Sequence, residues 1–128
     1  MPTRELTREN FEATITGGGT VLVDFWASWC GPCRMFGPIF EKASDAHPDI
    51  VFGKVDTEAQ EELAAAFGIS SIPTLMVFRD QIVLYSEPGA LPEPVLAYLI
   101  GQVRALDMDE VRKRIADHQA THQAHDHR

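Results

Sequence analysis

Short apolar runs alternate with amphipathic stretches along most of this chain. Residues 21–27 are apolar at almost every position, which is typical of a central strand covered on both faces. Residues 50–55 form a second strand-like run. Two more, at residues 74–78 and 82–86, are separated by only three residues, and this short connection predicts an antiparallel hairpin.

Helical patterns occupy the segments between these runs. We expect a first helix from about Thr7 to Ile15, ended by three consecutive glycines, and a second over residues 32–46. A third, alanine-rich helix is expected to start after the capping-box pattern that begins at Thr57. A fourth starts at the prolines near residue 93. Alternating helices and strands predict an α/β domain with a central mixed sheet flanked by helices.

The end of the chain changes in character. A short amphipathic helix is expected after Asp107, and residues 117–128 are polar, with four histidines and no apolar pattern, so we predict disorder there. We therefore divide the chain into a domain at residues 1–106 and a C-terminal helical extension at residues 107–128. The histidines are a candidate metal site, but a disordered tail offers no fixed geometry, so no metal is expected.

Composition and charge exclude several classes of protein. A chain of 128 residues fits one domain, and its net charge of −8 argues against nonspecific nucleic-acid binding. No apolar stretch reaches the about 20 residues needed to span a bilayer. Its first residues show no apolar signal region, so we expect a cytoplasmic protein.

The two cysteines are the strongest chemical signal. Cys30 and Cys33 are the only cysteines, and they follow the apolar run at residues 21–27 directly. A helix that begins at Cys30 would favour its thiolate, and Cys33, one turn later, could close a disulfide with it. In the cytoplasm such a pair indicates redox or metal chemistry. A zinc site is not expected, because no second pair of this kind exists and the histidines other than His47 lie in the tail.

Asp24 is the only charged residue in its apolar run, so burial is expected. Burial raises the pKa of a carboxyl group, which suits a general acid–base near neutral pH. The alternative is an acid at a sheet edge or in a structural ion pair. Lys54 lies within another apolar run and is either a buried partner of Asp24 or a solvated lysine at a strand end.

A proline precedes the third apolar run. Pro73 cannot donate to a strand ladder, so it belongs at a strand start or an edge. Only about 5–6% of X–Pro bonds are cis, so the residues alone predict a trans Ile72–Pro73 bond. Trp26 and Trp29 flank the cysteine segment, and Trp29, beside a turn, is expected to be the more exposed of the two.

The segment from Val23 to Met35, which contains Trp29-Cys30-Gly31-Pro32-Cys33, resembles the active-site segment of the thioredoxin family. The similarity extends over residues 6–106. It includes a proline inside the following helix, the strand Gly53-Lys54-Val55-Asp56, the loop Ser71-Ile72-Pro73-Thr74 and the turn Pro88-Gly89-Ala90.

The resemblance implies a thioredoxin fold and a protein-disulfide reductase. Cys30 would be the attacking thiolate and Cys33 the resolving thiol, with Asp24 exchanging a proton with Cys33 under the influence of Lys54. Pro73 would be cis, and the backbone of Ile72 would hydrogen-bond the substrate chain. The apolar contact surface would consist of Trp29, Gly31, Pro32, Gly89 and Ala90.

The family also implies partners. NADPH-dependent thioredoxin reductase would reduce the oxidised protein again, clients would be proteins with reducible disulfides, and we expect a monomer with no bound cofactor. Two alternatives stay open: an interaction subunit that docks through Trp29 without turnover, and an oxidase or isomerase of an oxidising compartment. The sequence departs from the family pattern at Gln81, where a hairpin glycine is usual, at Pro88, and in its extension.

Overall fold

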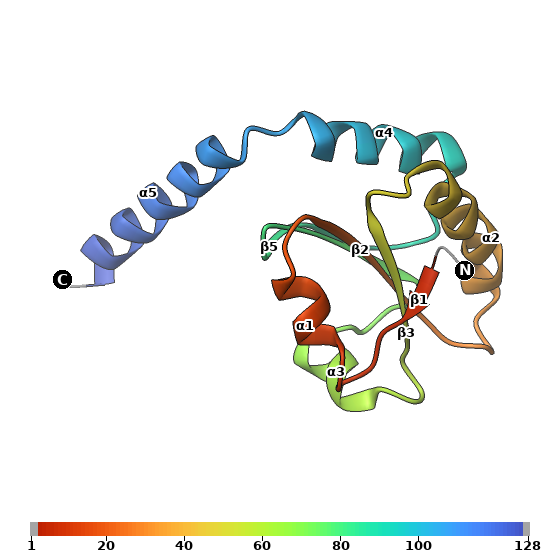
Figure 1. The fold of residues 1–128 in the computed structure, drawn as a ribbon. Coiled ribbons are helices and arrows are strands. Elements are labelled where there is room, and N and C mark those ends of the chain that lie inside the picture. Colours follow the sequence, from red (N-terminus) through yellow and green to blue (C-terminus); the bar gives the residue numbers. More distant parts are fainter. Residues whose placement is uncertain (1–2, 127–128) are drawn as a thin grey trace. The chain divides into compact units, whose positions relative to one another are not determined.

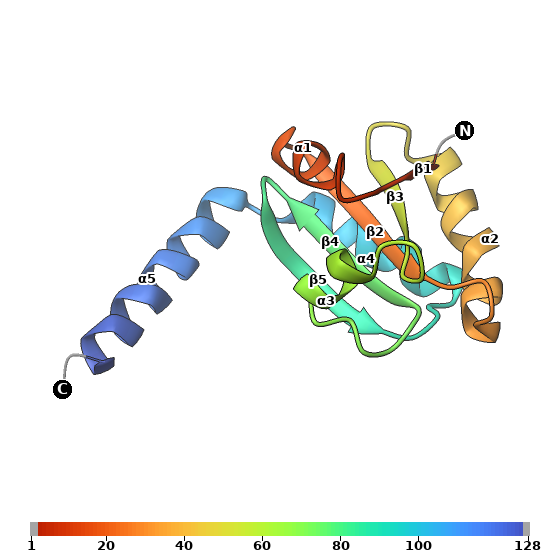
Figure 2. The same cartoon turned by 90° about the horizontal axis from the view of Figure 1, so that it is seen from below.

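The computed structural model describes residues 3–126, with side chains for residues 3–120. Its centre is a mixed five-stranded sheet in the order β1-β3-β2-β4-β5, seen face-on in Figure 2. The strands are β1 (Thr3–Glu5), β2 (Thr20–Trp26), β3 (Val51–Asp56), β4 (Thr74–Arg79) and β5 (Ile82–Pro88); the helices are α1 (Phe11–Thr16), α2 (Gly31–Ala46), α3 (Glu61–Ala66), α4 (Glu93–Ala105) and α5 (Met108–Asp126). The predicted α/β class and central mixed sheet are confirmed.

The central position of β2 explains its apolar sequence. β2 pairs in parallel with β3 and antiparallel with β4, so both of its edges are used. The β2–β3 register places Asp24 opposite Lys54. The β4–β5 hairpin is confirmed, and its two linking residues, Asp80 and Gln81, both have positive φ. This is the backbone of a type I′ turn, formed here without the glycine that usually favours it.

Each face of the sheet is covered by different helices. In Figure 1, α1 and α3 lie on one side of the sheet and α2 on the other. Alternate β2 residues, Val23 and Phe25, belong to the apolar cluster that also contains Phe11 of α1. On the opposite face Phe52 of β3 packs edge-on against Phe40 of α2, with ring centroids 5.2 Å apart. Because side chains alternate along a strand, Asp24 points to the α2 face.

One strand and the starts of two helices differ from the sequence prediction. The edge strand β1 was not expected, because its three residues are polar. Helix α1 begins at Phe11 rather than after Thr7, since Thr7 forms a preceding turn in which its carbonyl oxygen accepts from the Phe11 N–H. Helix α3 begins at Glu61, because the Thr57 hydroxyl donates to the Trp26 carbonyl oxygen instead of capping a helix.

The chain forms two compact units, Met1–Ala97 and Tyr98–Arg128. In the second unit α5 is one helix over Met108–Asp126, where a short helix followed by disorder was predicted. No glycine or proline interrupts this span, and ion pairs such as Arg114–Glu110 support it at helical spacing. The side chains of His122, His125 and His127 lie outside the described residues, and the domain boundary at residue 106 stays a prediction. Among the described residues, α5 and the other helices are too short or too polar to cross a membrane.

Candidate functional site

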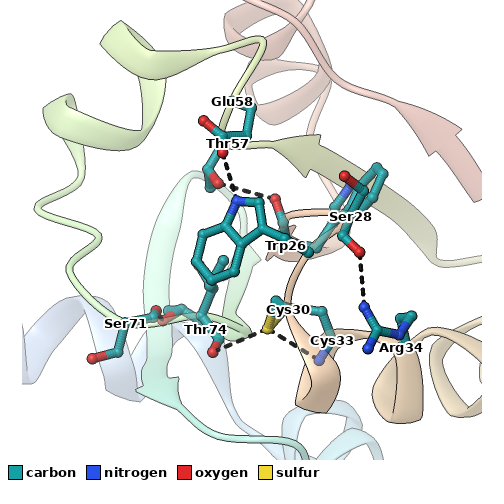
Figure 3. The surroundings of a disulfide bond; sticks show 11 residues. Trp26, Ser28, Cys30, Cys33, Arg34, Thr57, Glu58, Ser71 and Thr74 are labelled. Atoms are coloured by element: carbon teal, nitrogen blue, oxygen red, sulfur yellow. Dashed lines mark hydrogen bonds between the residues drawn. A yellow bond between two sulfur atoms is a disulfide. The ribbon is translucent and has the colours of Figure 1, made fainter.

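Cys30 and Cys33 form a disulfide at the start of α2, with their Cα atoms 5.2 Å apart (Figure 3). Cys30 is the N-cap residue, and its Sγ accepts a hydrogen bond from the Cys33 N–H over 3.3 Å. Gly31 and Pro32 form the first helical turn, where a proline is tolerated because its missing N–H has no helical partner. Both cysteines are almost buried, with 4% and 5% of their surface exposed. A thiolate at Cys30 would therefore sit at the positive end of the helix dipole.

The loop before β4 lies next to the disulfide. The Ile72 carbonyl oxygen lies 3.6 Å from Cys30 Sγ. The Ile72–Pro73 bond is cis, as the resemblance implied and against the expectation from residue statistics alone. The Pro73 carbonyl oxygen accepts a hydrogen bond of 2.8 Å from the Gly89 N–H, and Gly89 has φ +113°, a conformation that favours glycine. Half-buried Ala90 follows Gly89. Of the predicted substrate-binding backbone, the Ile72 carbonyl group is the part whose distance to a sulfur the structure gives.

Trp29 is the exposed residue of the site. Its side chain has 66% of its surface exposed, as its place beside a turn predicted. The indole Nε1–H donates to the Glu58 carboxylate over 2.5 Å, and Glu58 comes from the segment after β3. Figure 3 also shows Arg34 donating to the Ser28 carbonyl oxygen over 3.0 Å, which ties α2 to the turn before Cys30. Sequence reasoning missed Glu58, because no local pattern links it to Trp29.

Asp24 is buried in the middle of the sheet. Only 1% of its surface is exposed, and neither carboxyl oxygen has a hydrogen-bond partner among the described residues. Burial raises the pKa of Asp24 to about 7; the Lys54 charge acts to lower it and the Glu41 charge to raise it. The alternative of an acid at a sheet edge is wrong, because β2 is a central strand.

Lys54 is half-buried rather than a solvated lysine at a strand end, with 27% of its side chain exposed. Its Nζ lies 5.1 Å from the centroid of the Trp26 ring and 4.0 Å from Glu41 Oε1. Sequence reasoning did not include Glu41. The sequence carries no local signal for Glu41, because its partners Thr3 and Lys54 lie in other elements.

Glu41 and the predicted site residues therefore form two groups. The redox group contains the cysteines and the loops beside them, and the carboxylate cluster consists of Asp24, Glu41 and Lys54. Trp26 connects the two groups: its side chain packs against the cluster of Ala27, Cys30 and Cys33, and its ring also faces Lys54.

Known proteins match this combination of fold and site. The sequence model of the thioredoxin family matches residues 2–101. A putative thioredoxin 2 from Streptomyces coelicolor is 65% identical over 118 residues, which cover 92% of this chain and 88% of that protein. The solved thioredoxin structure from Malassezia sympodialis aligns with a TM-score of 0.70 and 36% identity, over 79% of this chain and 93% of the other. That of Plasmodium falciparum aligns with a TM-score of 0.72 and 32% identity, over 78% and 98%.

The fold, the disulfide at a helix start and these similarities agree with one another. Exchange between a protein dithiol and a disulfide is the chemistry that two cysteines in this position perform. The chain therefore belongs to the thioredoxin family and is a thiol–disulfide oxidoreductase whose redox-active pair is Cys30–Cys33.

Proposed function

We propose that this protein works as a reductant, carrying two electrons at a time from NADPH-dependent thioredoxin reductase to disulfides of client proteins in the cytoplasm. The observation that carries this proposal is the Cys30 sulfur at the N-cap of α2, which accepts the Cys33 N–H. Between the cysteines lie Gly31 and Pro32, which add no charged group that would stabilise the thiolate further. A thiolate that is not strongly stabilised favours donation of electrons over their retention.

The exchange starts on the reduced protein. The Cys30 thiolate attacks one sulfur of the client disulfide, forms a mixed disulfide and releases the other client sulfur as a thiolate that takes up a proton. Cys33 then loses its proton and attacks Cys30 Sγ. The second client thiolate leaves, and the Cys30–Cys33 disulfide remains. Two electrons have moved to the client, and the reductase would restore the dithiol at the expense of NADPH.

Asp24 is the proposed acceptor of the Cys33 proton. Its pKa of about 7 gives it a large ionised fraction at neutral pH and keeps it a better base than an ordinary carboxylate. Lys54, its register neighbour on β3, modulates that charge. A route for the proton through water is consistent with the lack of a hydrogen-bond partner for Asp24 among the described residues.

Client binding is proposed at the backbone of Ile72 and at an apolar surface around the sulfurs. Exposed Trp29 supports this role, as does the placing of Gly89 beside Pro73 by a backbone hydrogen bond. An extended client segment could pair with the Ile72 backbone as an added strand does, with specificity left to the disulfide itself. The list of proposed contact residues is Trp29, Gly31, Pro32, Ile72, Pro73, Gly89 and Ala90.

Trapping tests the order of attack. In Cys33→Ser the second step is blocked, so clients should accumulate as mixed disulfides on Cys30 that separate on non-reducing gels and release with dithiothreitol. Cys30→Ser is the matched control and should trap little. Equal trapping by the two variants would contradict the assigned roles.

Electron supply tests the direction of the reaction. With NADPH and a bacterial thioredoxin reductase, the protein should accelerate reduction of insulin disulfides, followed as NADPH consumption. Its reduction potential should lie below that of the glutathione pool, about −220 to −260 mV by extraction methods. A potential well above that range would identify an oxidase or isomerase instead, and no NADPH consumption with several reductases would end the carrier proposal.

The pH profile tests Asp24. Between pH 6 and 9 the turnover of the unaltered protein should rise through the pKa of Asp24, about 7, as the carboxylate ionises. Asp24→Asn should lose that rise and turn over more slowly, by about 10²-fold at the lower end for a lost general base. Identical profiles for the two proteins would refute the proton-transfer role.

A further inference from the structure

The Glu41 carboxylate joins three elements that are distant in sequence. Glu41 belongs to α2, and its Oε1 accepts a hydrogen bond of 2.7 Å from the Thr3 hydroxyl of β1. The same oxygen lies 4.0 Å from Lys54 Nζ of β3. Glu41 is half-buried, with 35% of its side chain exposed, so this contact is less screened than a surface pair. Thr3 thus fixes the oxygen that meets the Lys54 ammonium.

Within the described part of the chain, Asp24 and Glu41 are the carboxylates that interact with the Lys54 charge, and Glu41 is the one recorded in an ion pair with it. On the sheet, Lys54 is the register partner of Asp24. Its Nζ nevertheless lies against Glu41 and over the Trp26 ring, and Asp24 accepts no hydrogen bond from the described residues. The contacts of Lys54 Nζ are therefore with Glu41 and the Trp26 ring, and not with Asp24.

We propose that Glu41 is a positioning residue for disulfide exchange, which holds the Lys54 ammonium away from Asp24 and so keeps Asp24 an effective proton acceptor. The proposal rests on the role of Asp24 proposed above. If Lys54 paired with Asp24 directly, the carboxylate would be stabilised in its charged form and would become a weaker base. Glu41 also acts on Asp24 directly, because its negative charge opposes ionisation of the Asp24 carboxyl group. This direct effect and the proposed effect through Lys54 both favour the protonated form of Asp24.

The surroundings of Asp24 limit which groups can act on it. The neighbouring strand β3 contributes Lys54, and α2 contributes Glu41. On the other side of β2, the residue of β4 opposite Asp24 is Leu75, and a leucine side chain carries no charge. A change in the titration of Asp24 can therefore be traced to these two charged residues.

The test is a carboxyl titration of the full-length oxidised protein, in which the cysteines do not ionise. In Glu41→Gln the ¹³C carboxyl signal of Asp24 should titrate with a midpoint about half a pH unit lower, equivalent to an about threefold higher ratio of ionised to neutral form near neutral pH. Glu93→Gln is the matched control. It removes the same charge from an exposed ion pair with Lys42 and should leave the midpoint of Asp24 unchanged.

A double variant tests whether Glu41 acts through Lys54. In a Lys54→Gln background, Glu41→Gln should lower the midpoint of Asp24 by less than about half as much as in the unaltered protein. An equal effect in both backgrounds would overturn the positioning mechanism, because Glu41 would then act only through its own charge.

Turnover separates this proposal from the one on which it rests. We expect the pH–rate profile of Glu41→Gln to move to lower pH together with the midpoint of Asp24. An unchanged midpoint overturns the proposal for Glu41 alone and leaves Asp24 as the proton acceptor. A lowered midpoint with an unmoved pH–rate profile overturns the role of Asp24, and with it the part of Glu41 in the exchange.

Discussion

At Asp24, burial lowers stability near neutral pH and also gives the carboxyl group the raised pKa on which its proposed role as a proton acceptor depends. In the unfolded chain its carboxyl ionises near pH 4, whereas in the folded protein burial raises its pKa to about 7. Between these values the folded state holds a proton that the unfolded state has lost. Because of this proton, the free energy of unfolding falls as pH rises from about 4 to about 7. Above about pH 7 the contribution of Asp24 to the free energy of unfolding no longer changes with pH.

Asp24→Asn should remove this pH dependence. The free energy of unfolding of the variant minus that of the unaltered protein should become about 2–3 kcal/mol larger between pH 5 and pH 8. Urea denaturation of the two oxidised proteins would measure this difference. Asp45→Asn, at an exposed position of α2, is the control for removal of one carboxylate. A pH-independent difference for Asp24→Asn would mean that its carboxyl titrates alike in both states.

Sequence reasoning identified residues whose signal is local. The cysteine pair and Asp24 stand out within a single segment, because one carboxylate interrupts an apolar run and two thiols follow it. Glu41 and Glu58 do not stand out, since each is one of many acids and acquires its role only from a distant partner. For Glu41 those partners are Thr3 and Lys54, 38 and 13 positions away, and no periodicity within one element reveals such contacts.

At the level of secondary structure, the packing of strand β3 requires a glycine at position 53. Leu6 is fully buried and occupies the space that a Cβ atom on Gly53 would need. The Leu6 N–H also donates to the Lys54 carbonyl oxygen over 2.8 Å, which continues the pairing of β1 with β3. Gly53 therefore permits close approach of the edge segment to the strand that carries Lys54.

Gly53→Ala should lower the free energy of unfolding by about 1–3 kcal/mol, because the added methyl group overpacks the contact with Leu6. The same substitution at Gly101, an exposed position inside α4 with open space around it, should raise the free energy of unfolding by up to about 1 kcal/mol. Thermal and urea unfolding would measure both. Opposite signs are the expected result, and a neutral Gly53→Ala would show that Leu6 can move aside.

Elements were predicted well where packing imposes a period and poorly at their ends. The strand at residues 21–27 was predicted within one residue, because burial on both faces leaves a continuous apolar run. The starts of α1 and α3 were wrong, since threonine hydroxyl and carbonyl groups at Thr7 and Thr57 form turns or tertiary contacts as readily as caps. Strand β1 is recognisable only by its pairing with β3.

For the whole molecule, the redox-active pair and the residues proposed to assist it belong to one unit. The disulfide, the loop at Pro73 and the carboxylate cluster all lie within Met1–Ala97. We therefore expect a chain that ends after residue 106 to fold and to reduce insulin disulfides within about twofold of the full-length rate, a difference of less than about 0.5 kcal/mol in activation free energy. Circular dichroism and the coupled NADPH assay would measure this. Loss of folding would place the boundary of the domain beyond residue 106.

The near-complete burial of both sulfurs has a consequence for the choice of clients. With 5% or less of either cysteine exposed, little of Cys30 can be reached from outside, so a client disulfide must fit closely against the protein surface at Cys30 in order to react. A disulfide packed inside a native domain cannot be presented there until its chain loosens. The protein should therefore sort its clients by how often they open: disulfides in mobile loops or damaged chains should be reduced first, and those of stably folded domains should be reduced at the rate of local unfolding.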